Sequence, residues 1–137
     1  MKKNCGILFA IILILLGILL TFKKPSPQEP DVVGSVRAGQ SEFLTVVANQ
    51  KQIDDKKEFA LLLIEMYKEN DFQTIKFSID KGYATSLEMQ VYLKEKEVGE
   101  KSPALVVKYV PVEYNKGYDV VNNPDKFKLY IDGELIE

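Results

Sequence analysis

The sequence contains no histidine and no tryptophan, and its single cysteine is Cys5. Without imidazole side chains the chain cannot build a Ser–His–Asp triad, a Cys–His pair or a histidine general base. Zinc sites also depend on histidine and cysteine ligands, and one cysteine cannot form a disulfide within the chain. We therefore expect no catalytic residue, no metal site and no cofactor in this chain.

Recognisable phosphate and calcium motifs are missing as well. The glycines of the C-terminal half are isolated from one another, so no glycine-rich phosphate loop is present, and no segment has EF-hand spacing. Residues 119–125, "DVVNNPD", offer oxygen ligands, but Asn, Pro and Asp in this arrangement are typical of a turn. A hydrolase that uses two carboxylates stays open as a minor alternative, because it needs no histidine.

Basic and acidic residues are unevenly distributed. All 20 acidic residues follow Lys24, and four of the 18 basic residues are Lys2, Lys3, Lys23 and Lys24. Residues 25–137 therefore carry 14 basic against 20 acidic side chains, a net charge of −6. Nucleic-acid binding requires a basic surface, so we expect no nucleic-acid partner.

An uncharged run of 19 residues extends from Asn4 to Phe22. As a helix it would be roughly 28 Å long, at about 1.5 Å per residue, which matches the apolar core of a bilayer. A cleaved signal peptide is the alternative, but its apolar region is usually shorter and is followed by a small-residue cleavage site. We predict that residues 1–24 form an uncleaved signal-anchor, a transmembrane helix with residues 4–22 in the lipid bilayer.

The flanks of this run predict its orientation. Short basic N-termini usually stay in the cytoplasm, whereas long domains are translocated largely regardless of their charge. We expect a single-pass protein of the cytoplasmic (plasma) membrane, with its C-terminal domain outside.

Residues 25–40 have the composition of a linker. Pro25, Pro27 and Pro30 prevent a continuous helix and favour an extended path, and Gly34 and Gly39 add flexibility. We predict a Pro/Gly-containing linker over 25–40, which separates the anchor from a small α+β domain over 41–137.

The clearest helix of this domain is "DDKKEFALLLIEMYKEN", residues 54–70. Asp54 is a suitable N-cap and Asn70 a plausible end. Apolar side chains recur with helical spacing and form one stripe. Its members are Phe59, Leu62, Leu63, Met66 and Tyr67, with Leu61 and Ile64 on its flanks.

The remaining domain shows strand periodicity. Five segments favour strands, the first of them only weakly because a short helix would also group its apolar residues. They are "SEFLTVVAN" (41–49), "TIKFSID" (74–80), "LEMQVYLK" (87–94), "ALVVKYVPV" (104–112) and "KFKLYIDG" (126–133). Alternation places one residue in two on the inner face, and the inner residues of the last three strands are Leu87, Met89, Val91, Leu93, Leu105, Val107, Tyr109, Phe127, Leu129 and Ile131. Gly82 would close a hairpin between the second and third segments, and Asp132–Gly133 a turn after the last. The predicted fold class is α+β, with one helix packed on a four- to five-stranded antiparallel sheet.

Tyrosines are the main candidates for a binding site. In a simple meander Tyr92, Lys108 and Tyr130 share the polar face of the sheet, and Tyr114 and Tyr118 lie in the long connection after Pro111. Tyrosine supplies contact area at low entropic cost and is enriched in interfaces. The alternative is structural, because exposed strands favour aromatic residues in any case.

Three functional hypotheses follow. The first is a membrane-anchored, extracytoplasmic domain that binds a protein or a small ligand. The second is an accessory subunit of a membrane complex that acts through its transmembrane helix. The third and least favoured is the carboxylate-based hydrolase.

Overall fold

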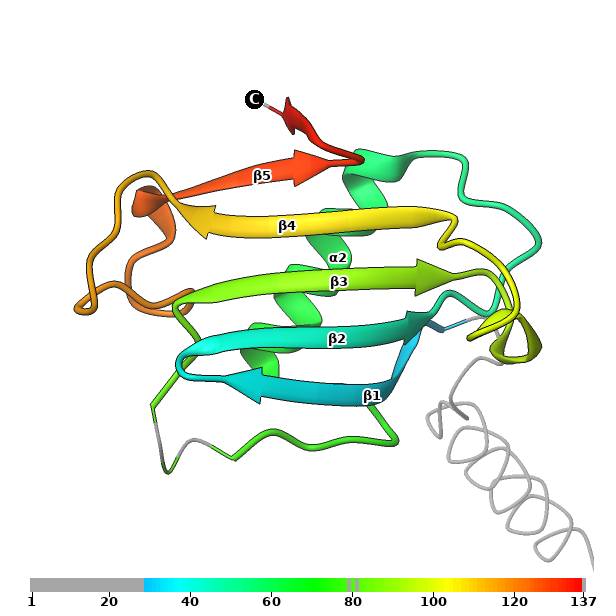
Figure 1. The fold of residues 1–137 in the computed structure, drawn as a ribbon, viewed down its shortest axis with the longest axis horizontal. Helices are drawn as coiled ribbons and strands as arrows, with labels where there is room; N and C mark the ends of the chain where they lie inside the picture. Colours follow the sequence, from blue (N-terminus) through cyan, green and yellow to red (C-terminus); the bar gives the residue numbers. More distant parts are fainter. Residues whose placement is uncertain (1–28, 79, 81, 137) are drawn as a thin grey trace, which may run out of the picture.

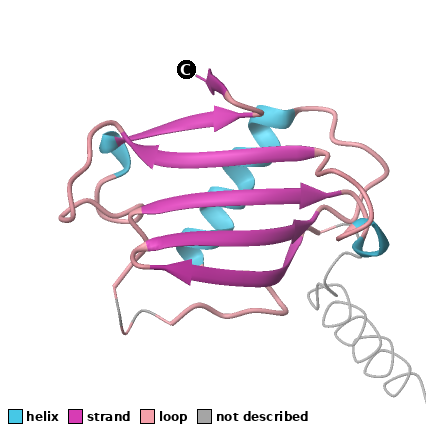
Figure 2. Ribbon diagram, viewed as in Figure 1, coloured by secondary structure: helices cyan, strands magenta, loops and turns pink. Residues whose placement is uncertain are grey.

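The structure, a computed structural model, describes residues 29–78, 80 and 82–136. These residues form a six-stranded sheet with one α-helix across one of its faces (Figure 1). The strands lie side by side in chain order and are β1 (Asp31–Ala38), β2 (Ser41–Val47), β3 (Ser86–Tyr92), β4 (Leu105–Pro111), β5 (Phe127–Ile131) and β6 (Glu134–Ile136). The helix is α2 (Lys56–Glu69), and two short 3₁₀ turns are η1 (Glu95–Glu97) and η2 (Pro124–Lys126). Figure 2 shows that α2 lies behind the strands, whereas no helix formed by the described residues crosses the front face of the sheet.

The sheet is mixed, so the prediction of a four- to five-stranded antiparallel sheet is wrong. Strand β2 pairs with β3 in parallel, and the other four pairs of neighbouring strands are antiparallel. The parallel pair arises because the chain leaves β2, crosses one face of the sheet through α2 and enters β3 in the same direction. The predicted transmembrane helix over 1–24 lies outside the described residues. Within the described part of the chain, no helix has the length and apolar character needed to span a bilayer.

Strand β1 lies inside the predicted 25–40 linker. The two glycines of this segment, Gly34 and Gly39, have specific roles and do not simply add flexibility. The pairing register of β1 with β2 shifts between Val32 and Gly34, which marks a bulge, and glycine is common at such positions. Gly39 has φ +62° and begins the two-residue turn between Ala38 and Ser41. A positive φ at the first turn position suits the tight hairpin that joins β1 to β2.

The predicted strand "TIKFSID" is not a strand among the described residues. Side chains, not a neighbouring strand, bind the backbone of this region. The Asp31 carboxylate accepts hydrogen bonds from the backbone N–H groups of Gln73 (2.9 Å) and Thr74 (3.2 Å). The Asn70 side chain accepts a hydrogen bond from Phe77 N (2.8 Å) and donates one to Phe77 O (3.1 Å). The predicted hairpin through Gly82 is therefore replaced by an irregular connection from α2 to β3.

Helix α2 begins and ends close to the predicted residues. Its N-cap is Asp55, not Asp54, and the Asp55 carboxylate accepts a hydrogen bond from Glu58 N (3.0 Å). The C-cap is Asn70, as predicted, in the left-handed conformation with φ +55°.

The buried face of α2 is rotated relative to the predicted stripe. The buried residues are Phe59, Ala60, Leu63, Ile64 and Tyr67. Leu61 and Leu62 are 48% and 46% exposed, so the prediction that Leu62 faces the core is wrong. Ala60 is fully buried, so the side of the helix that carries Ala60, and not the side that carries Leu62, faces the sheet.

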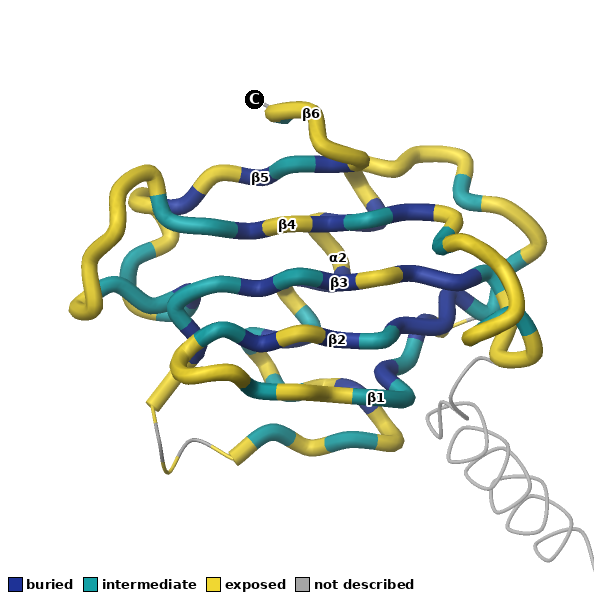
Figure 3. The backbone as a smooth tube through the Cα atoms, in the orientation of Figure 1, coloured by how far each residue is buried: buried dark blue, intermediate teal, exposed yellow. Residues whose placement is uncertain are grey.

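The central strands carry the core as predicted. Figure 3 shows buried positions alternating with less buried ones along β3, β4 and β5. All predicted inner residues within these three strands are buried. They pack in one cluster with β1, β2 and the buried side of α2. The alternate residues of these strands consequently form the opposite face of the sheet, and no helix of the described part of the chain lies over it.

Candidate functional site

A continuous row of six residues crosses the uncovered face of the sheet, one residue from each strand. Successive members are paired in register from β1 to β6. In strand order they are Val36, Phe43, Glu88, Lys108, Tyr130 and Leu135. We call this set the open-face row. Because side chains of in-register neighbours stand beside one another on a sheet, the six side chains form one band.

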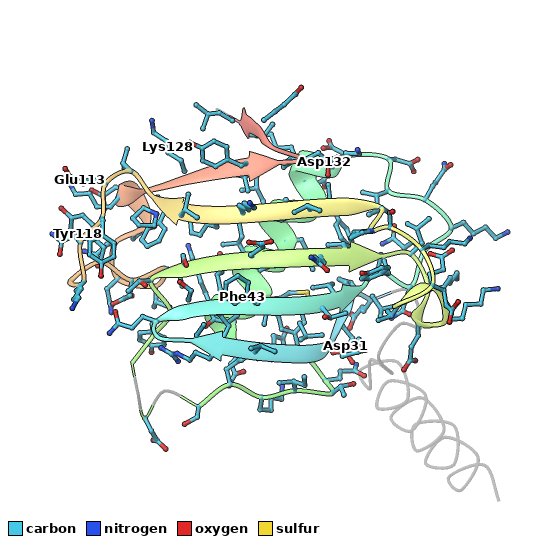
Figure 4. All side chains as sticks on the ribbon, viewed as in Figure 1. Asp31, Phe43, Glu113, Tyr118, Lys128 and Asp132 are labelled. Carbon is cyan, nitrogen blue, oxygen red and sulfur yellow. The ribbon has the colours of Figure 1, made fainter. Side chains whose placement is uncertain are left out.

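The chemistry of the open-face row changes from its edges to its centre. Val36 and Phe43 form an exposed apolar pair on one side, and Phe43 is 41% exposed (Figure 4). Tyr130 and Leu135 form an aromatic and aliphatic pair on the other side. Apolar pairs flanking a charged centre are an unusual composition for a merely solvated sheet face, since large exposed apolar groups tend to mark interaction sites.

The charged centre of the row is a loose ion pair. Lys108 Nζ lies 4.0 Å from Glu88 Oε2, and both side chains are partly exposed. This distance is too long for a hydrogen bond, so both groups keep capacity to bind a partner's polar atoms. The pair itself stabilises the fold by little, since partly exposed ion pairs contribute about 0–1 kcal/mol.

A hollow of about 350 Å³ adjoins Phe43 on the same face. Residues of β1, β2 and β3 line it, among them Gly34, Thr45, Glu88 and Gln90. Gly34 has no side chain, and a Cβ at this position would meet the Thr45 side chain at 3.4 Å. The hollow thus combines an aromatic wall with a carboxylate and a carboxamide, groups suited to a partner's apolar side chain and its polar donors.

Of the predicted site residues, only Lys108 and Tyr130 are brought together on this face. They lie directly opposite each other in register. Tyr92 is at the far end of β3, opposite Val47, and both are buried although neither belongs to the main core cluster. Figure 1 shows the connection from β3 to β4 at this end of the sheet. Tyr92 thus keeps the predicted face, where its hydroxyl donates a hydrogen bond to Gln90 Oε1 (3.5 Å), but it is buried and offers little surface to a partner.

Tyr114 and Tyr118 lie at the other end of the sheet, in the connection from β4 to β5. Tyr114 is 83% exposed and lines a cleft of about 500 Å³ with the β1–β2 turn and the start of β3. Tyr118 is half-buried, and Lys126 Nζ lies 5.8 Å from its ring centroid. Figure 4 shows Tyr118 well away from Phe43, and no residue of the open-face row lines the cleft at Tyr114.

Sequence reasoning misses Val36, Phe43 and Leu135. The signal for Phe43 is present, because the alternation that places Leu44 and Val46 in the core leaves Phe43 on the opposite face. Val36 is hidden in a segment with the composition of a linker. Leu135 lies in a three-residue strand, which is too short to show periodicity.

The opposite, helix-covered face holds the one buried charged side chain of the described residues, Glu42. Its carboxylate accepts a hydrogen bond from Ser35 Oγ (3.0 Å) and lies 3.7 Å from Arg37 Nε. Burial and, secondly, the Glu42 charge raise the pKa of Tyr67 to about 12. The contacts of Glu42 connect β1 with β2, and its charge acts on Tyr67 of α2. Among the described residues, no cluster of acidic or cysteine side chains is arranged to hold a metal ion.

Comparison with protein-family models, with curated proteins and with solved structures gave no match.

Proposed function

We propose that this protein is a membrane-anchored binding module. Residues 4–22 hold it in the cytoplasmic membrane, and the following domain binds a protein partner outside the cytoplasm through the uncovered face of its sheet. The sequence supports the anchoring half, because an uncharged run of 19 residues has the length of a bilayer core.

One observation carries the binding half of the proposal. The open-face row extends without interruption over all six strands and has large apolar side chains at both of its ends. Five inter-strand spacings of about 4.8 Å make it roughly 24 Å wide. A band of this width suits a macromolecular surface better than a single small ligand, because standard protein interfaces bury about 800 Å² per partner.

The arrangement of residues also matches the anatomy of protein interfaces. Aromatic side chains such as Phe43 and Tyr130 are typical anchors, and they need neighbouring groups that exclude water and fix the register. The Glu88–Lys108 pair supplies one charge of each sign in the middle of the band. Complementary charges on a partner would orient it, while the apolar pairs would supply most of the affinity.

Site-specific photo-crosslinking tests the proposal in cells that express the full chain. A benzophenone amino acid replaces Phe43 in one variant and Leu62 in a matched control. Leu62 is 46% exposed, similar to the 41% of Phe43, but it lies on α2 and not on the open face. We expect a discrete protein adduct from position 43 and none from position 62, whereas equal capture from both positions would contradict the proposal.

A second arm separates this function from association through the anchor. With the photo-probe at Leu135, Phe43→Ser is expected to lower the yield of the adduct at least tenfold, and Leu62→Ser to leave it unchanged. If residues 4–22 alone carry the association, as in an accessory membrane subunit, a probe placed within 4–22 captures the partner equally well in both variants.

A further inference from the structure

A second hollow lies where the helix layer meets the β5–β6 edge of the sheet. It has a volume of about 450 Å³, within the usual range of ligand pockets. Its lining residues come from α2, β4, β5 and β6 and are Lys57, Leu61, Tyr109, Phe127, Lys128, Leu129, Leu135 and Ile136. It is distinct from the hollow beside Phe43, with which it shares no residue.

The interior of this edge hollow is apolar. Tyr109 and Phe127 are mostly buried and stack with 5.0 Å between ring centroids and 25° between ring planes. Leu61 and Leu135 are each about half exposed, at 48% and 47%. Two leucines left in this state beside a buried aromatic pair present apolar surface that a bound hydrocarbon would remove from water.

The charged side chains among the described lining residues of the edge hollow are both lysines. Lys57 and Lys128 line it, and its described lining includes no aspartate or glutamate. A third lysine, Lys68, holds its Nζ 5.7 Å from the ring centroid of Tyr109. Residues 25–137 carry a net charge of −6, so a set of lysines around an apolar hollow runs against the average charge of the domain.

We propose that the edge hollow binds an acyl chain that carries an anionic headgroup. The chain would lie against the Tyr109–Phe127 pair and the two exposed leucines, and the headgroup would interact with Lys128. Both a free fatty acid and an anionic phospholipid supply this chemistry, and each is present at a membrane surface. The proposal does not depend on the open-face row. Leu135 is the only residue that the two sites share.

The test uses the full chain in nanodiscs of phosphatidylcholine, with a dodecanoate that carries a photoactivatable diazirine near its methyl end. Cross-linked positions are mapped by peptide mass spectrometry. We expect saturable labelling of peptides from α2, β5 and β6. Unlabelled dodecanoate should compete at a concentration at least tenfold lower than neutral dodecanol does, because dodecanol cannot pair with Lys128.

Neighbouring residues of α2 provide a matched pair of variants. Leu61→Glu places a negative charge in the hollow and should lower labelling at least tenfold. Leu62→Glu, with the same substitution at a similar exposure outside the hollow, should label like the unmodified chain. Lys128→Glu is expected to weaken labelling by dodecanoate and to leave labelling by a photoactivatable dodecanol unchanged, and circular dichroism verifies that each variant is folded.

A final arm distinguishes the two sources of the ligand. If phospholipid is the source, nanodiscs that contain phosphatidylglycerol suppress labelling by dodecanoate, and if free fatty acid is the source, they do not. Either result supports the shared chemistry.

Equal labelling of Leu61→Glu and Leu62→Glu, or equal competition by dodecanol and dodecanoate, overturns the proposal. Phe43 does not line the edge hollow, so Phe43→Ser alters the open face alone. Failure of the protein-binding proposal would therefore show in the photo-crosslinking from position 43 and not in the labelling by dodecanoate.

Discussion

The Asp132 carboxylate accepts a hydrogen bond of 2.8 Å from the ammonium group of Lys56, which lies 76 residues earlier in the chain. Its other oxygen accepts a hydrogen bond of 2.9 Å from the backbone N–H of Val106. Asp132 also has φ +50° in the turn between β5 and β6 (Figure 4). One side chain therefore connects the start of α2, the start of β4 and the turn that leads to the edge strand.

This relationship predicts a small, pH-dependent contribution to stability. The hydrogen bonds from Lys56 and Val106 hold the pKa of Asp132 below its usual value. A lowered pKa in the folded state means that the stabilisation is present above the unfolded-state pKa of about 3.9 and is lost as the pH falls through the folded-state value. Asp132→Asn should lower the free energy of unfolding by less than about 1 kcal/mol at pH 7, because the pair is exposed.

Chemical denaturation at pH 7 and pH 2.5, with low and high salt, measures this effect. The difference between Asp132→Asn and the unmodified chain should shrink at acidic pH and at high salt. Asp132→Ala also removes the acceptor for Val106 and places alanine at φ +50°, so it should cost about 2–4 kcal/mol more. A difference that is equal at both pH values would contradict the assigned ionic contribution.

The rotated face of α2 predicts opposite outcomes for two adjacent leucines. Leu63 is fully buried and Leu62 is 46% exposed. Leu63→Ala should lower the free energy of unfolding by about 2–5 kcal/mol, because it removes buried methyl groups and leaves a cavity. Leu62→Ala should change it by no more than about 0.5 kcal/mol. Thermal unfolding of the full chain in detergent micelles, followed by circular dichroism, compares the two variants.

The central part of the fold could be predicted because each element there shows its own periodicity. β3, β4 and β5 bury alternate residues, such as Leu87, Val107 and Leu129, and this alternation appears directly in the sequence. The turn at Asp132–Gly133 is equally local, since both residues take the positive φ that favours Asp-Gly in tight hairpins.

The errors concern structure that depends on distant parts of the chain. "TIKFSID" alternates like a strand, but Asp31 binds the backbone just before it and Asn70 binds the backbone of Phe77. No local sequence pattern predicts either contact. Strand β1 was hidden by Gly34 and Gly39, whose bulge and turn positions depend on pairing with β2. The parallel β2–β3 pair likewise depends on the path of the whole crossover.

The candidate site was only half predictable for the same reason. Lys108 and Tyr130 belong to adjacent strands of the meander, so alternation alone places them together. Val36 and Leu135 belong to the two outermost strands, which lack a clear pattern of their own. Tyr92 lies on the face that alternation predicts, but alternation does not show that this end of the face is covered.

The centre of the open-face row predicts a charge-reversal cycle. Glu88 and Lys108 lie directly opposite each other on β3 and β4, and like charges at such positions are destabilising by about 0.2–1 kcal/mol. Glu88→Lys and Lys108→Glu should each lower the free energy of unfolding by this amount, and the double reversal should restore it. Partner capture from position 43 should fall in both single variants and also in the double variant, because a partner senses the reversed polarity. Full recovery of capture by the double variant would argue that the pair acts on stability alone.

The end of α2 predicts a ranked series at Asn70. This residue has φ +55°, and its side-chain amide donates to and accepts from the backbone of Phe77. Asn70→Gly keeps the backbone conformation but loses both hydrogen bonds, and we expect a cost of about 1–2 kcal/mol. Asn70→Ala also incurs the steric cost of the left-handed conformation and should cost about 1–2 kcal/mol more. Hydrogen exchange of the Phe77 amide should be faster in both variants, and stabilities in the reverse order would contradict the two separate roles.

The burial of Tyr67 and its electrostatic interaction with Glu42 predict a change of stability at alkaline pH. The pKa of Tyr67 is raised to about 12, first by burial and second by the Glu42 charge, while Arg37 and a hydrogen bond with the Ala84 backbone act the other way. A raised pKa means that folding favours the neutral phenol, so this stabilisation is complete below the unfolded-state value of about 10 and is lost as the pH rises toward 12. Burial also raises the pKa of Tyr109, so tyrosinate absorbance should show late titration from both residues, and Tyr67→Phe should remove the step near pH 12. Glu42→Gln should move this step to lower pH but leave it above 10, because burial, the larger cause, remains. A step that does not move would show that the Glu42 charge does not affect the pKa of Tyr67.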